Sequence, residues 1–290
     1  EYFANTITQI LNNMKIKHLL CFIALCLFFT PGKAQQLSVM TLRNGATVYI
    51  WEDKSKPDVF GMIAFKVGSV DDPEQYTGLA HYLEHVMFKG TQTIDALDWE
   101  KEKPIYEKII AKYDERAALS DPAAREAVDK EINDLTREAA QYAAGNEFSL
   151  LVDHMGGQGL NASTGYDQTE YHNSFPPSQL EKWLEIYSER LIDPVFRGFQ
   201  TELEAVYEEY NMYNDDRGSR MREFIYEQAF GDHPYARPII GLPEHLKNPQ
   251  LSKLIDFYNT WYGPQNMSII LVGNIDAKEA IPMIRDKFER

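Results

Sequence analysis

The sequence predicts an α+β fold because of the order of its predicted elements along the chain. Segments with strand composition and segments with helical periodicity are mixed without a regular β-α-β alternation, which argues against a doubly wound parallel sheet. The 290 residues are 44% hydrophobic, which is enough to bury one large core or two modest ones. The net charge of -15 argues against a nucleic-acid partner, because phosphate binding needs clustered lysine and arginine.

Residues 1–34 are predicted to be an upstream extension followed by a signal peptide. Lys15 and Lys17 precede a short apolar run, residues 19–29, and small residues follow it. The run is short for a membrane span, although a membrane anchor or a buried helix is the alternative. Residues 35–290 are then expected to form an exported domain that is periplasmic or extracellular.

The first part of that domain shows strand patterns followed by a helix signal. Residues 38–52 predict two strands around an Asn-Gly turn, and residues 59–67 predict a third strand. Asp72 and Pro73 then suit the cap and the first turn of a helix.

Residues 99–148 are rich in charged residues and alanine, and they predict a helical hairpin. Apolar residues recur at helical spacing in two runs. Between the runs, residues 120–122 read Ser-Asp-Pro, which is a helix stop followed by a capped restart. The charges of the hairpin are expected to solvate one of its faces.

The rest of the chain mixes strands and helices. Residues 151–171 predict a return to strands, with one strand at 160–164 and another beginning at 168. Ser178 is expected to cap the helix that follows. The later predicted elements are helices at about 200–213, 220–230, 249–261 and 277–289, and a buried strand at 268–272.

Three residues in the first predicted helix have the pattern of a metal site. His81 and His85 are four residues apart, so on a helix they share one face and can hold one ion. Glu84 leans toward the same face, where a carboxylate can take a proton from water. The order H-x-x-E-H is a zinc-hydrolase signature. Both cysteines of the chain lie in the predicted signal peptide, so any metal site must use His, Asp and Glu.

Several motifs in a fixed order resemble the pitrilysin/insulinase family of zinc peptidases, M16. The resemblance begins near residue 38 and continues to the end of the chain. It implies a mostly antiparallel sheet packed with helices, zinc as the cofactor and peptide-bond hydrolysis as the activity. The motifs are Gly78-Leu79-Ala80-His81-Tyr82-Leu83-Glu84-His85, Leu160-Asn161-Ala162, Glu202-Leu203-Glu204-Ala205-Val206-Tyr207-Glu208-Glu209, His233-Pro234-Tyr235, Asn266-Met267 and Val272-Gly273-Asn274.

In this family, two glutamates on a downstream helix complete the site. Glu202 and Glu209 match that pattern and, being seven residues apart, share a helix face. The resemblance therefore implies that Glu209 is the third zinc ligand and that Glu202 supports the histidines. Glu208 is the alternative ligand if the register is shifted by one residue.

The resemblance also implies a place for the substrate. Leu160, Asn161 and Ala162 match the family's edge strand, which takes an extended peptide by strand addition. This mode suits oligopeptides and unfolded polypeptides, because it relies on backbone hydrogen bonds. The alternative is an ordinary edge strand with no ligand.

The chain departs from the family pattern in two ways. The separation between His85 and Glu209 is longer than usual, and the hairpin at 99–148 accounts for the excess as an insertion. The insertion can gate substrate entry, contact a partner or only decorate the fold. The resemblance covers only the first half of active members, so we expect the chain to be a fragment of a longer protein with a homologous C-terminal half, to work with a partner subunit, or to form a homodimer. The leading hypothesis is a zinc endopeptidase, and the alternative is a non-catalytic peptide-binding or scaffold subunit.

Overall fold

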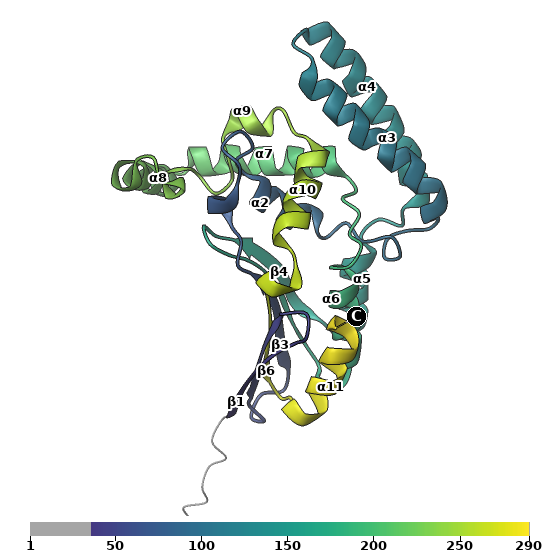
Figure 1. Ribbon diagram of the computed structural model, residues 1–290, viewed down its shortest axis with the longest axis vertical. Helices are drawn as coiled ribbons and strands as arrows, with labels where there is room; N and C mark the ends of the chain where they lie inside the picture. Colours follow the sequence, from purple (N-terminus) through teal and green to yellow (C-terminus); the bar gives the residue numbers. More distant parts are fainter. Residues whose placement is uncertain (1–35, 290) are drawn as a thin grey trace, which may run out of the picture. The chain divides into compact units, whose positions relative to one another are not determined.

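The computed structural model describes residues 36–289, shown in Figure 1. The predicted signal peptide lies outside the described residues. No helix among residues 36–289 combines the length and the apolar character needed to cross a membrane. The described residues form one compact unit built on a single sheet, with one hydrophobic core.

The sheet has six strands in the order β1-β2-β6-β3-β5-β4. β6 runs parallel to β2 and antiparallel to β3, and β5 runs antiparallel to both β3 and β4. The prediction of an α+β fold with a mostly antiparallel sheet is therefore confirmed. The strand bounds are β1 Gln36–Thr41, β2 Thr47–Glu52, β3 Val59–Phe65, β4 Gln158–Thr164, β5 Thr169–Phe175 and β6 Met267–Gly273.

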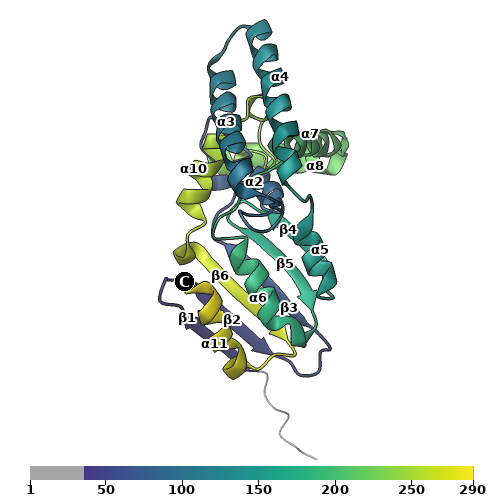
Figure 2. The same cartoon turned by 90° about the vertical axis from the view of Figure 1, so that its right-hand side faces the viewer.

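The helices divide into a group on one face of the sheet and a group at one end. α5, α6 and α11 cover the face turned toward the viewer in Figure 2, whereas α2, α7, α8 and α10 gather at the end where β4 finishes. The helix bounds are α2 Leu79–Val86, α3 Trp99–Ala118, α4 Pro122–Ala139, α5 Glu147–His154, α6 Leu180–Glu189, α7 Phe199–Asp215, α8 Arg217–Phe230, α9 Pro243–Leu246, α10 Leu251–Trp261 and α11 Ala277–Phe288.

Aromatic packing fastens α6 to the sheet. Trp183 stacks on Phe175 of β5 and on Tyr187, with ring centroids 5.2 and 4.2 Å apart. The Trp183 indole and the Tyr187 hydroxyl both donate to the side-chain oxygen of the buried Asn173, at 2.8 and 2.7 Å. Because these buried polar groups are paired, the large rings can be buried without leaving an unsatisfied donor.

The structure contains the predicted helical hairpin, but its two helices cover residues 99–139 of the 99–148 predicted, and residues 147–148 belong to α5. α3 and α4 pack along their apolar faces, where Ile105, Ile109, Val128 and Ile132 are buried. Asp121 caps α4 by accepting a hydrogen bond from the amide of Ala124. The hairpin projects away from the sheet, beyond α2 and α7 (Figure 1).

Three local predictions were wrong. Residues 151–154 belong to α5 rather than to a strand. Ser178 lies within a short 3-10 helix, and α6 begins at Leu180 without a side-chain cap. The helix that carries the histidines begins at Leu79, so Pro73 lies outside it, although the sequence Gly78-Leu79-Ala80 also indicated an opening at this point.

Candidate metal centre

The chain enters α2 through a glycine that tertiary packing requires. Gly78 is the cap residue, with a φ of 89°, and a side chain there would meet the carbonyl oxygen of Ile240 at 2.5 Å. Only glycine adopts this conformation readily while allowing so close a backbone approach. The positive φ and the close contact together place the first turn of α2.

Asp72 does cap α2, but from a distance along the chain. Its two carboxylate oxygens accept hydrogen bonds from the amides of Gly78 and Ala80, at 2.7 and 2.8 Å. Burial raises the pKa of Asp72 to about 7, although these two hydrogen bonds act in the opposite direction. The residue expected to cap the helix therefore does so across a loop.

α2 places both histidines and the adjacent glutamate at the same end of the sheet. The rings of His81 and His85 lie on one helix face, with centroids 4.8 Å apart. The hydroxyl of Tyr82 on α2 donates to the backbone carbonyl of Phe199 at the start of α7. This bond ties the histidine helix to the helix that carries the acidic residues.

α7 brings Glu209 to both imidazoles. Its Oε2 lies 3.6 Å from His81 Nε2 and 3.5 Å from His85 Nε2. One donor atom from each of these three residues lies within 4.8 Å of the others, a grouping that can hold a metal ion. Glu208 instead lines a different cavity, together with Arg116 and Lys247.

Glu202 approaches the opposite nitrogen of His85. Its Oε2 lies 3.6 Å from His85 Nδ1, and its Oε1 lies 2.5 Å from the ammonium of Lys89. A carboxylate at Nδ1 favours the proton on that nitrogen and leaves Nε2 free for a metal. Sequence reasoning did not identify Lys89, because its partner lies on a distant helix.

Burial and charge separate the pKa values of the two histidines. Burial lowers the pKa of His81 well below its usual value, and the neighbouring His85 reinforces the effect. Burial also lowers the pKa of His85, but hydrogen bonds with Glu202 and Glu209 outweigh it and raise this pKa to about 9. The hydrogen bond with His85 lowers the pKa of Glu209. The metal-free site therefore keeps His81 neutral and an ionised carboxylate beside it.

Glu84 lies next to the cluster in a more enclosed position. The residue is 9% exposed, and the hydroxyl of Thr164 donates to its Oε2 at 2.9 Å. Burial raises the pKa of Glu84 above its ordinary value, and the bond from Thr164 opposes the rise. A raised pKa brings a carboxyl closer to the range in which it can both accept and return a proton. Thr164 is a second residue that sequence reasoning missed as part of the site.

Leu160, Asn161 and Ala162 lie on β4, the last strand of the sheet, which has no further strand beyond it among the described residues. Thr164, at the end of the same strand, makes the contact with Glu84. A cavity of about 260 Å³ opens beside His81 at this point. Its other lining residues include Tyr166, Tyr213, Arg222, Tyr226 and Ile240.

The donor set suits zinc. Two imidazole nitrogens and one carboxylate oxygen are zinc ligands in proteins, and three protein ligands leave a fourth position for water or substrate. Glu202 at His85 Nδ1 supplies the outer partner that ligating histidines commonly have. The residues present therefore fit a catalytic rather than a closed structural site.

Comparison with known proteins then decides the family. Residues 47–103 and 134–242 match the model described as Insulinase (Peptidase family M16). The chain belongs to peptidase family M16. Residues 250–290 match a second M16 model, described as the Peptidase M16 inactive domain. The first match omits residues 104–133, most of the α3–α4 hairpin, so the hairpin is where this M16 chain differs from the family model.

Two sequence relatives are named zinc proteases, and one solved protease structure shares the fold. An uncharacterized zinc protease of Mycobacterium leprae is 26% identical over 77% of this chain and 39% of its own length. The zinc protease PqqE of Helicobacter pylori is 24% identical over 86% of this chain and 46% of its own. The solved first half of the periplasmic protease PqqL from Escherichia coli has a TM-score of 0.66 and 25% identity, covering 88% of this chain and 47% of that one. The M16 chain described here thus spans less than half the length of these relatives.

Proposed function

We propose that the protein is a zinc-dependent endopeptidase that hydrolyses oligopeptides or unfolded polypeptides. The observation that carries the proposal is the convergence of His81, His85 and Glu209, with Glu84 beside them. We assign the first three to zinc, Glu84 to proton transfer and Glu202 to support of His85. Membership of M16 and the names of the relatives support this assignment.

The side chains divide the chemistry between binding and proton transfer. Zinc held by the three ligands would lower the pKa of water at the open position and polarise the scissile carbonyl. Glu84 takes the proton of the attacking water and returns it to the leaving amine. Thr164 holds the Glu84 carboxylate in position during both transfers. His85 keeps its Nε2 toward the site because Glu202 faces its Nδ1.

The free edge of β4 is the proposed binding position for the peptide backbone. Strand addition along Leu160, Asn161 and Ala162 would carry a peptide past Thr164 and toward Glu84. A side chain next to the cleaved bond can then enter the cavity beside His81, where tyrosines and Arg222 line the wall. Backbone recognition with one shaped cavity favours short or unfolded substrates.

The domain plan and the location are also proposed. We infer that residues 35–290 are one catalytic unit with a helical insertion at 99–148, preceded by a signal peptide that directs it to the periplasm or the extracellular space. The chain covers less than half the length of these relatives. This supports the proposal that it acts together with a homologous C-terminal half, a partner subunit or a second copy of the chain. The relative PqqL is described as periplasmic.

The substitution Glu84→Gln tests the proposal, measured with a companion C-terminal half supplied. The variant should keep near-stoichiometric zinc, while cleavage of a quenched fluorescent peptide falls by about 10² to 10⁴. Glu208→Gln is the matched control and should cleave normally. Retained zinc-dependent cleavage by Glu84→Gln would refute the role of this residue. A wild-type protein that binds peptide, but neither binds zinc nor cleaves the peptide, would favour the scaffold subunit instead.

A further inference from the structure

We propose that Lys89 is a positioning residue for the metal centre, acting through Glu202 on His85. The inference rests on the proposed zinc site and adds a residue to it. Lys89 lies four residues after His85, in the bend that follows α2. Its ammonium and the His85 imidazole contact the two oxygens of the same carboxylate, that of Glu202.

The geometry gives each oxygen of Glu202 one partner. Oε1 lies 2.5 Å from Lys89 Nζ, and Oε2 lies 3.6 Å from His85 Nδ1. A carboxylate free to rotate could turn either oxygen, or neither, toward the imidazole. The ammonium occupies Oε1, so the remaining oxygen faces Nδ1 and the His85 ring is held with Nε2 toward Glu209.

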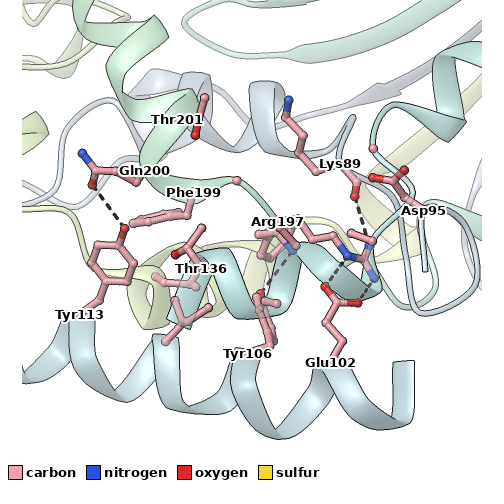
Figure 3. A pocket seen from close by; sticks show the side chains of 18 of the residues that line it. Lys89, Asp95, Glu102, Tyr106, Tyr113, Thr136, Arg197, Phe199, Gln200 and Thr201 are labelled. Carbon is pink, nitrogen blue, oxygen red and sulfur yellow. Dashed lines mark hydrogen bonds and ion pairs between the residues drawn. The ribbon is translucent and has the colours of Figure 1, made fainter. Parts of the chain in front are cut away.

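The main chain of Lys89 is held from the opposite side. Arg197 Nη1 donates to the carbonyl oxygen of Lys89 at 3.2 Å, and the rest of its guanidinium forms a bidentate pair with Glu102, at 2.6 and 2.8 Å. Figure 3 shows this arrangement: the Arg197 bond ends on the Lys89 carbonyl, and the ammonium extends the other way. Both residues of the pair are nearly buried, so the anchor is rigid.

The anchor links the inserted hairpin to the metal centre. Glu102 belongs to α3, and the contacts run from Glu102 to Arg197, to the backbone and side chain of Lys89, and then to Glu202. Lys89 and Arg197 also line a cavity of about 290 Å³ between the hairpin and the start of α7 (Figure 3). The Lys89 side chain is 35% exposed, so its replacement should leave the fold intact.

Zinc affinity in substituted proteins tests the inference. Lys89→Met should weaken zinc binding by about tenfold, the lower end of the effect of losing an outer-shell partner. Lys89→Arg should restore affinity to within about threefold of the wild type, because it keeps the cation at Glu202. Lys112→Met is the control, since Lys112 makes similar ion pairs with Glu115 and Glu131 on the hairpin.

A double-mutant cycle separates positioning from a general loss of structure. Glu202→Gln combined with Lys89→Met should weaken zinc binding no more than Glu202→Gln alone, because both act on the same contact. Additive losses, or zinc affinity in Lys89→Met within twofold of the wild type, would overturn the inference while leaving the zinc site standing. A wild-type chain that binds no zinc would instead refute the proposed function.

Discussion

The hydroxyl of Thr164, at the end of the edge strand, donates a 2.9 Å hydrogen bond to Oε2 of Glu84 on α2. This one bond joins the strand proposed to bind the peptide to the carboxylate proposed to move the proton. It fixes which oxygen of Glu84 is held by the protein and leaves the other available for water. The bond therefore connects substrate placement to proton transfer.

Thr164→Val should lower kcat by about tenfold, because a hydrogen bond to a carboxylate contributes about 1.5 kcal/mol or more. Zinc content should not change, since the Thr164 hydroxyl donates to Glu84 and not to a proposed ligand. Thr164→Ser keeps the hydroxyl and serves as the control. Steady-state hydrolysis of a fluorescent peptide measures the effect, and an unchanged kcat in Thr164→Val would show that Glu84 needs no such support.

The charge on His85 should make the metal-free protein sensitive to alkaline pH. Although burial lowers its pKa, the hydrogen bonds with Glu202 and Glu209 raise it from 6.5 to about 9. The stabilisation is therefore fully present below pH 6.5 and is lost as the pH rises through 9. His81, whose pKa is lowered by burial, changes charge below this window.

Urea unfolding in the presence of a chelator measures this dependence. The difference in unfolding free energy between the wild type and His85→Gln should shrink steadily from pH 6.5 to 9. A difference that stays constant across that range would mean that the imidazole is not charged by its two carboxylate neighbours in the metal-free fold.

Asp72 should stabilise the start of the histidine helix. Asp72→Ala leaves the amides of Gly78 and Ala80 without their acceptor, and should lower the free energy of unfolding by about 1–2 kcal/mol. Asp72→Asn keeps one acceptor oxygen and removes the buried charge, so the stability of this variant should lie between that of the wild type and that of Asp72→Ala. Equal stability of the alanine variant and the wild type would contradict the capping role.

The segment from Asp72 to Gly78 shows how far local sequence can predict where a helix begins. Acidic capping chemistry was visible at Asp72, but the helix start depends on Gly78, which the backbone of Ile240 approaches closely. The sequence Gly78-Leu79-Ala80 indicates a helix opening, but the contact that requires glycine joins segments far apart in the chain, so no local pattern reveals that contact. Residues 151–154 were misassigned for a similar reason, because apolar residues there suit a strand as well as the helix that packs on the sheet.

The metal centre likewise contains residues that the sequence predicts and residues that only the structure identifies. The spacing of His81 and His85 predicts a shared helix face from sequence, and the structure places them so. The family resemblance was needed to select Glu209, since acidic helices offer many glutamates. Neither could identify Lys89 or Thr164, because their roles depend on contacts with distant residues.

The zinc content of Glu209→Gln, compared with that of Glu208→Gln, tests the central claim most directly. Atomic emission after dialysis should find near-stoichiometric zinc in the wild type and in Glu208→Gln. In Glu209→Gln, the affinity for zinc should fall by about 100-fold or more. This loss is larger than the one expected when a residue that only supports a ligand is replaced. Zinc retained in Glu209→Gln but lost from Glu208→Gln, or no zinc in the wild type, would contradict the site formed by His81, His85 and Glu209.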